Sequence, residues 1–110
     1  MTAPRVGFVY WVRASFQDAT VAQEWLEWMR REHIAQVIAA GALEATLLRI
    51  EGAGAPGGAM ETRYGFADRD AFSRYEREEA PALRAAGAVH FPASRGVAYE
   101  RGTALILGEF

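Results

Sequence analysis

Residues 18–40, DATVAQEWLEWMRREHIAQVIAA, form the longest amphipathic pattern of the chain. At 100° per residue, the apolar side chains of this run fall within roughly 120° of arc. They are Ala22, Trp25, Leu26, Met29, Val37 and Ala40. Asp18 is a favourable N-cap residue, and Gly41 is a natural helix stop. The run therefore predicts one helix over residues 18–40, with His33 near the middle of its buried face.

Four shorter segments, rich in β-branched and aromatic residues, predict strands before and after this helix. They are residues 5–13, 43–51, 59–67 and 97–107. The first contains apolar residues in both alternating sets, which is typical of a central strand covered on both faces. The glycine-rich residues 52–58 are expected to join the second and third strands as a hairpin. Gly102 indicates a bulge or bend in the last strand.

A second helix is expected to begin at Asp68 and to end at Gly87, because its apolar residues recur at helical spacing. Pro81 lies within it and predicts either a kink or a break into two short helices. Residues 89–93 are expected to form a turn before the last strand. His90 lies in this turn and is expected to be exposed.

The order of these elements predicts the architecture. Strand, helix, strand, strand, helix, strand, with right-handed crossovers, gives a four-stranded antiparallel sheet with both helices on one face. This α+β arrangement is the ferredoxin-like βαββαβ fold, expected here as a single domain over residues 1–110. The other face of the sheet needs cover, which a second copy of the chain can supply. We therefore expect a homodimer in the form of a dimeric α/β barrel.

Composition excludes several classes of site. The 110 residues include no cysteine, lysine or asparagine, and 12 cations against 14 anions give a net charge of −2. The lack of cysteine excludes disulfides, thiolate zinc sites, Fe–S clusters and a cysteine nucleophile, and the lack of lysine excludes a Schiff base. The negative charge disfavours a nucleic-acid binder with a broad basic face. No apolar run is long enough to span a bilayer, so we expect a cytoplasmic protein without membrane contact.

His33 allows two interpretations. A lone histidine on an apolar helix face is often a core residue that is hydrogen-bonded to one backbone carbonyl. In the other interpretation it lies in a pocket, where desolvation against Trp25 and Met29 disfavours the charged form and leaves a neutral general base. Three tryptophans and four tyrosines fit a flat aromatic ligand and a plain aromatic core equally well.

The first helix also resembles that of a known family. The matching residues are Trp25, Trp28, Met29, Glu32, His33, Ile34, Val37 and Gly41, followed by Tyr64-Gly65-Phe66, Tyr75, Ala80-Pro81, Leu83-Arg84 and Phe91. On these residues nearly the whole chain is similar to a family of small bacterial proteins of unknown function in the dimeric α/β-barrel superfamily. Relatives there include antibiotic-biosynthesis-monooxygenase-like and ether-degradation-associated proteins.

That superfamily contains cofactor-free quinone-forming monooxygenases, haem-degrading monooxygenases, muconolactone isomerases and polyketide cyclases. Several of them hold a flat polycycle between the helices and the sheet. The resemblance therefore implies a pocket for a small aromatic or polyketide-like ligand, without a cofactor or a metal, in which His33 is the base or the orienting donor. Together with the helical phase, it implies as pocket residues Trp25, Trp28, Met29, Phe72, Tyr75 and Glu79.

Two departures from the superfamily pattern bear on this expectation. Haem-degrading and some quinone-forming members use an asparagine on the first strand, where this chain has Tyr10 and Trp11. That difference counts against these two activities by their usual mechanism. Glu79 stands where the family often has a histidine. A Glu79 carboxylate close to His33 would favour the imidazolium and would weaken the general-base interpretation.

Two other functions remain open. One is a non-catalytic ligand-binding or assembly module, whose barrel exists to dimerise. It predicts a filled core with no cavity near His33, and substitutions that reduce stability and not activity. The other is an RNA-binding sheet, because residues 63–67, Arg-Tyr-Gly-Phe-Ala, partly match the aromatic motif on the third strand of RNA-recognition modules. It requires exposed rings of Tyr64 and Phe66. The negative net charge disfavours it, and we expect no nucleic-acid partner.

Three further patterns have weak support as functional motifs. Residues 52–57 match G-x-G-x-x-G, but a strand-like segment follows where a dinucleotide site needs a helix. Arg49 and Arg63 could form an anion clamp, but pairing with nearby glutamates in a solvated rim is favoured. The two histidines are far apart and lack metal-ligand spacing, and no serine lies in a G-x-S-x-G elbow.

Overall fold

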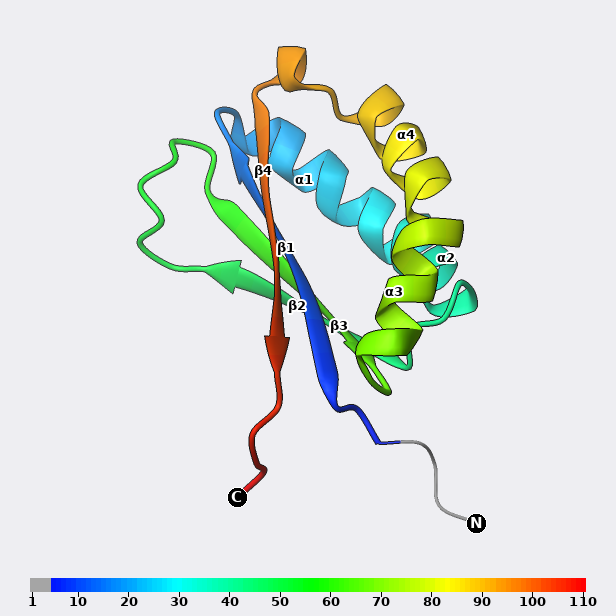
Figure 1. Ribbon diagram of the computed structural model, residues 1–110. Coiled ribbons are helices and arrows are strands. Elements are labelled where there is room, and N and C mark those ends of the chain that lie inside the picture. Colours follow the sequence, from blue (N-terminus) through cyan, green and yellow to red (C-terminus); the bar gives the residue numbers. More distant parts are fainter. Residues whose placement is uncertain (1–4) are drawn as a thin grey trace.

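The computed structural model describes residues 5–110, and these residues form a four-stranded antiparallel sheet. Its strands are β1 (Phe8–Phe16), β2 (Glu44–Ile50), β3 (Ala59–Phe66) and β4 (Val97–Leu105). Their order is β2-β3-β1-β4, so β1 is central as its composition predicted, and β2 and β3 form the expected hairpin. The element order is βαββαβ (Figure 1), which confirms the ferredoxin-like prediction.

The helices lie on one face of this sheet (Figure 1). They form two runs: α1 (Ala19–Trp28), the π-helical turn η1 (Met29–His33) and α2 (Ile34–Ala39), then α3 (Arg69–Glu78) and α4 (Ala80–His90), with the 3-10 turn η2 (Ala93–Arg95) after them. Asp18 caps α1 by accepting a hydrogen bond from the backbone N–H of Thr20 at 2.8 Å. Asp68 caps α3 in the same way, from Ala71 at 2.8 Å. The helix expected over residues 18–40 is therefore present, with a π-turn that its periodicity did not reveal.

Pro81 divides the second helical run, as predicted. α3 ends at Glu78 and α4 starts at Ala80, which leaves the proline in a first turn, where its missing N–H costs nothing. The run does not stop at Gly87, as we expected, but continues to His90. A Cβ atom on Gly87 would lie 3.5 Å from Cη2 of Trp28, an ordinary van der Waals contact. Gly87 therefore does not terminate the helix, and it packs next to the ring of Trp28.

β1 begins and ends later than residues 5–13, where its sequence pattern placed it. The loop of the β2–β3 hairpin extends it at the far end. Phe16 N–H donates to the Gly58 carbonyl at 2.9 Å, and Gly57 N–H donates to the Phe16 carbonyl at 2.8 Å. A Cβ atom on Gly57 would lie 2.6 Å from the backbone carbonyl carbon of Asp18. The strand end and the start of α1 thus depend on contacts with a distant loop.

Gly102 does not form the predicted bulge. It pairs with Trp11 in an unbroken register between β1 and β4, and β4 ends at Leu105. The ring of Trp11 occupies the space above Gly102, where a Cβ atom would lie 2.3 Å from Cζ2 of the ring. The bulge prediction was wrong because glycine makes room here for a neighbouring indole and not for a bent backbone.

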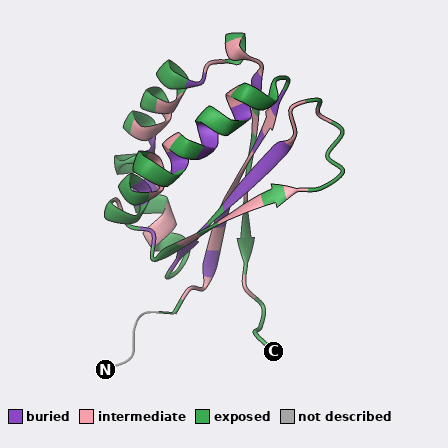
Figure 2. Ribbon diagram, turned by 180° about the vertical axis from the view of Figure 1, so that it is seen from behind, coloured by how far each residue is buried: buried purple, intermediate pink, exposed green. Residues whose placement is uncertain are grey.

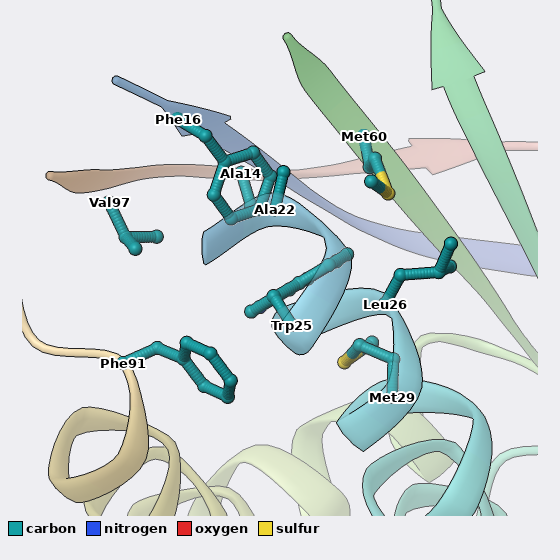
Figure 3. Close-up of a cluster of buried hydrophobic side chains, with 9 residues drawn as sticks. All are labelled: Ala14, Phe16, Ala22, Trp25, Leu26, Met29, Met60, Phe91 and Val97. Carbon is teal, nitrogen blue, oxygen red and sulfur yellow. The ribbon is translucent and has the colours of Figure 1, made fainter. Parts of the chain in front are cut away.

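The core lies between the helices and the sheet, where buried residues gather on the facing sides of both (Figure 2). One cluster consists of Ala14, Phe16, Ala22, Trp25, Leu26, Met29, Met60, Phe91 and Val97 (Figure 3). A second consists of Phe8, Tyr10, Val37, Ala42, Tyr64, Phe66, Tyr75 and Ala80. Tyr64 and Phe66 are only 2% and 0% exposed. These rings therefore cannot form the exposed stacking platform that an RNA-binding sheet requires.

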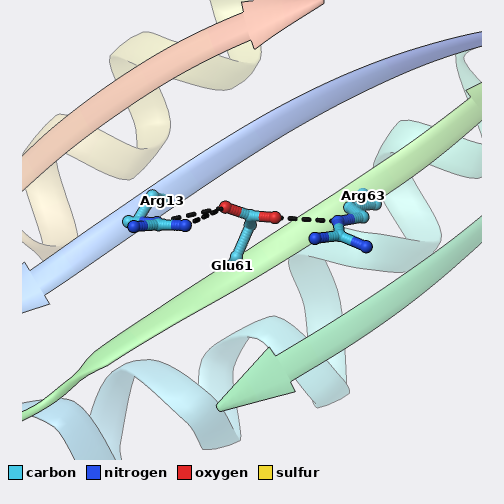
Figure 4. A network of polar contacts seen from close by, with 3 residues as sticks. All are labelled: Arg13, Glu61 and Arg63. Atoms are coloured by element: carbon cyan, nitrogen blue, oxygen red, sulfur yellow. Dashed lines mark hydrogen bonds and ion pairs between the residues drawn. The ribbon is translucent and has the colours of Figure 1, made fainter. Parts of the chain in front are cut away.

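No described helix covers the other face of the sheet (Figure 1). Val9 and Trp11 of β1 are half-buried on this side. Beside them, the Glu61 carboxylate of β3 accepts hydrogen bonds from Arg13 Nη2 at 2.9 Å and from Arg63 Nε at 2.8 Å (Figure 4). Burial raises the pKa of Glu61, but the hydrogen bonds from Arg63 and Arg13 outweigh it and hold this pKa below its ordinary value. The Glu61 carboxylate is therefore buried and charged, and both of its oxygens are hydrogen-bonded on the uncovered face.

The structure also places the weaker motifs. Arg49 pairs with Met60, whose side chain faces the helices, whereas Arg63 lies on the uncovered face. The two guanidinium groups therefore do not form an anion clamp. Residues 52–57 lead into β3, not into a helix. Within residues 5–110, no helix is long and apolar enough to cross a membrane.

Candidate functional site

A cavity of about 580 Å³ lies between the sheet and the helices. This volume is typical of sites for small organic molecules. One wall is aromatic and apolar, formed by Trp25, Trp28, Met29 and Phe91. In Figure 3, Phe91, which follows α4, lies across from Trp25 of α1. The remaining lining includes four phenols, one imidazole and two guanidinium groups, from Tyr10, Tyr64, Tyr75, Tyr99, His33, Arg84 and Arg101.

The cavity brings together five of the seven residues that the sequence indicated. They are Trp25, Trp28, Met29, His33 and Tyr75. Phe72 is not among the lining residues. It packs in the core, with ring centroids 5.3 Å from Phe8, 5.0 Å from Tyr10 and 5.4 Å from Phe66. Glu79 lies exposed at the break between α3 and α4 and does not line the cavity either. The expected contact of a Glu79 carboxylate with His33 therefore has no structural support.

The π-turn determines where His33 lies. The Ile34 N–H donates to the carbonyl of Met29, five residues earlier, which widens this turn by one residue. In a regular α-helix, residues five apart lie roughly 140° apart around the axis. In this widened turn, the rings of Trp28 and His33 stack with centroids 4.5 Å apart and planes at 21°. Such π-turns are frequent at functional sites.

His33 is a neutral imidazole, and one of its ring nitrogens has no hydrogen-bond partner within the described residues. Burial, and secondarily the positive charge of Arg101, lower its pKa from 6.5 to about 4. Its Nδ1 is buried and has no hydrogen-bond partner within residues 5–110. A core histidine is expected to satisfy this nitrogen with a backbone carbonyl, because an unpaired buried polar atom costs about 1–3 kcal/mol. The backbone partner that the core interpretation requires is therefore not found within residues 5–110, and His33 lines the cavity.

Two of the lining residues, Arg84 and Tyr10, belong to a hydrogen-bonded network. Arg84 donates to both oxygens of Glu76, at 3.0 and 2.9 Å, and to the Tyr10 hydroxyl at 3.1 Å. Burial raises the pKa of Tyr75 to about 12 and also raises that of Tyr64. These phenols are therefore neutral at physiological pH and offer hydrogen bonds without charge.

Five polar lining residues were not predicted as site residues: Tyr10, Tyr64, Arg84, Tyr99 and Arg101. Arg84 belongs to the motif that supported the family resemblance, and Tyr10 lies in the region of the first strand where the resemblance implies an asparagine in some superfamily members. These two signals were available in the sequence. Arg101 has no such signal, because it lies on β4 and reaches the site only through the strand pairing.

Residues 5–110 contain no group of three or more histidine, cysteine, aspartate or glutamate side chains that could hold a metal ion. His33 lies instead among aromatic rings and arginines.

A sequence profile for a domain of unknown function, DUF4286, matches residues 8–102. The chain belongs to the DUF4286 family. The predicted resemblance to an uncharacterised family is thereby confirmed. No curated protein matches the sequence.

Solved structures similar to this DUF4286 chain share its fold over almost the full length. A dimeric ferredoxin-like protein from an uncultured marine organism has a TM-score of 0.71 and 15% identity, over 96% of this chain and 100% of that one. The monooxygenase from the gene ActVA-Orf6 of Streptomyces coelicolor, in complex with nanaomycin D, has a TM-score of 0.69 and 18% identity, over 98% of this chain and 94% of that one. SnoaB, a cofactor-independent oxygenase from Streptomyces nogalater, has a TM-score of 0.54 and 17% identity, over 96% of this chain and 97% of that one.

Proposed function

We propose that this DUF4286 protein binds a flat aromatic compound in the cavity and that His33 exchanges a proton with it. The observation that carries the proposal is a neutral His33 that lines a cavity of about 580 Å³ and stacks on the ring of Trp28. Trp25, Trp28 and Phe91 offer the faces and edges against which aromatic rings pack.

The proposed chemistry begins with a proton transfer. An aromatic hydroxyl or an enol of the ligand gives its proton to the His33 imidazole, which leaves an anionic ligand beside an imidazolium. With a pKa of about 4, His33 is a weak base in the empty cavity. Negative charge on the ligand compensates, because an anion next to the imidazolium raises the pKa of that group. The electron-rich anion can then react with dioxygen, isomerise or cyclise without a cofactor.

Two similar structures support an aromatic ligand and this reaction class. One is a monooxygenase in complex with nanaomycin D, and the other is a cofactor-independent oxygenase. The low identities mean that the likeness in fold alone does not carry over either activity. What supports the extension to this chain is its own cavity, which lies between the helices and the sheet and is lined by aromatic residues.

We also propose that a second copy of the chain covers the uncovered face of the sheet. Val9 and Trp11 are half-buried there, and the Glu61 carboxylate already has its charge compensated by two arginines. A face with paired charges and apolar side chains can be buried against a copy of itself in an isologous dimer. The dimeric ferredoxin-like structures show that this fold forms dimers.

The test is an NMR titration of the two histidine rings with 1,4-naphthohydroquinone, anthrone and anthraquinone. We expect the His33 signals to shift on addition of at least one of these compounds, and the His90 signals to stay. Consumption of the bound compound under air is then followed by absorbance. His33→Ala should abolish turnover while leaving binding within a few-fold, and His90→Ala serves as the matched control.

The outcomes separate the candidate functions. His33 signals that ignore every compound would contradict the proposed pocket. Binding without turnover, unaffected by His33→Ala, would establish a non-catalytic ligand-binding module instead. The non-catalytic alternative predicted a filled core with no cavity near His33, and the cavity argues against that prediction.

A further inference from the structure

We infer that the ligand bears an acidic oxygen group, a carboxylate or an ionised hydroxyl, and that Arg101 binds this group. The inference rests on the proposed function and specifies the chemical class of the compound. Its basis is the charge of the cavity, the freedom of the Arg101 side chain and the position of Arg101 near His33.

The cavity lining is positively charged. Within the described chain it contains two arginines, Arg84 and Arg101, but no aspartate and no glutamate. The imidazole of His33 is neutral and the phenols of Tyr64 and Tyr75 are held in their neutral form. A cleft lined by one sign of charge raises the local concentration of ligands of the opposite sign.

The two arginines differ in their hydrogen-bond and ion-pair partners. Arg84 is held by the Glu76 carboxylate and the Tyr10 hydroxyl, so its charge is compensated inside the protein. Arg101 takes part in none of the ion pairs found within residues 5–110. Its guanidinium lies over the ring of Tyr99, with Cζ 5.2 Å from the ring centroid. Arg101 therefore presents an uncompensated charge to the cavity.

Arg101 also lies close enough to His33 for its charge to act on the imidazole. Both side chains line the cavity, Arg101 from β4 and His33 from η1. An acidic oxygen bound by Arg101 offsets this charge and places a hydrogen-bond partner within the same polar region. The rings of the compound then pack on the Trp28 and Phe91 side. A neutral aromatic compound makes the same packing contacts, but the positive charge of Arg101 stays without a partner.

The experiment compares two probes of matched shape, anthraquinone-2-carboxylate and anthraquinone-2-carboxamide, by quenching of tryptophan fluorescence. We expect the native protein to bind the carboxylate about tenfold tighter than the amide, the range typical of one charge-assisted hydrogen bond. Arg101→Gln should reduce this preference to about twofold without weakening the amide. Arg101→Lys keeps the charge and should restore part of the preference.

Arg74→Gln is the matched control, because Arg74 is exposed on α3 and does not line the cavity. It should leave the preference unchanged, and thermal melts verify that each variant is folded. If both probes bind the native protein equally, or if Arg101→Gln keeps the full preference, the inference is wrong while the aromatic pocket stands. If neither probe binds, the inference and the proposed function fall together.

Discussion

His33 is neutral because of its surroundings, not because of a fixed hydrogen-bond partner. It stacks on Trp28 with ring centroids 4.5 Å apart, and its Nδ1 has no partner within residues 5–110. Burial disfavours the imidazolium, and the charge of Arg101 acts in the same direction. The residue is thus ready to take up a proton only when a ligand brings compensating charge, which links its protonation to binding.

This lowered pKa makes stability depend on pH. The pKa of His33 is 6.5 in the unfolded chain and about 4 in the folded one. As pH falls from 6.5 to about 4, the unfolded state binds the proton first, so the free energy of unfolding decreases in this window. We expect the native protein to lose on the order of 2 kcal/mol relative to His33→Gln over this window.

Urea unfolding of both proteins at several pH values measures this loss, and His90→Gln is the control. Comparison with His33→Gln removes the contribution of the carboxylates, which titrate in both proteins. A difference between the native protein and His33→Gln that stays constant with pH would show that the folded structure does not hold His33 neutral.

At the scale of elements, the hairpin loop connects parts of the fold that are far apart in the sequence. Gly57 and Gly58 exchange backbone hydrogen bonds with Phe16 at the end of β1. The loop backbone thereby packs against the start of α1, at Asp18. This contact connects the end of β1 and the start of α1 to the hairpin loop.

Gly57→Ala should disturb this junction. Its Cβ atom would lie 2.6–2.8 Å from the Asp18 backbone and the Phe16 carbonyl oxygen, and backbone atoms cannot move aside as a side chain can. We expect a loss of about 3 kcal/mol in the free energy of unfolding. Gly54→Ala is the control, because nothing lies within 4 Å of its Cβ position and only its positive φ is strained. The control should cost about 1 kcal/mol. Equal losses in urea unfolding would refute the steric explanation.

At the scale of the whole molecule, the two faces of the sheet differ in cover. The helices, the core clusters and the cavity lie on one side. The other side presents half-buried apolar side chains and the Arg13–Glu61–Arg63 network without any described helix over it (Figures 1 and 4). Such a face is the natural surface for the proposed second copy.

Light scattering should therefore give a mass twice that of the 12.1 kDa chain. Val9→Glu introduces an unpaired charge on the uncovered face, near the start of β1, and should yield a monomer, because an unpaired buried charge is strongly destabilising. Ala35→Glu, at an exposed position of α2, should leave the dimer intact. A native protein with the mass of a single chain would overturn the dimer proposal.

Local patterns in the sequence determined the elements and much of the helical side of the site. The periodicity of residues 18–40 placed Trp25, Met29 and His33 on one face, because helical phase depends only on spacing along the chain. The element order and the break at Pro81 follow from equally local rules. The strand limits did not, since Phe16 belongs to β1 through bonds to the distant Gly58.

Only the tertiary structure decided which polar groups meet in the cavity. Strand pairing and helix packing bring Tyr10, Arg84 and Arg101 to His33, although they come from β1, α4 and β4. The same packing turns Phe72 into the core and leaves Glu79 in solvent, although helical spacing had made Phe72 a candidate and the family resemblance had made Glu79 one. The physical reason is that spacing fixes the face of one element, whereas a cavity depends on how several elements close around it.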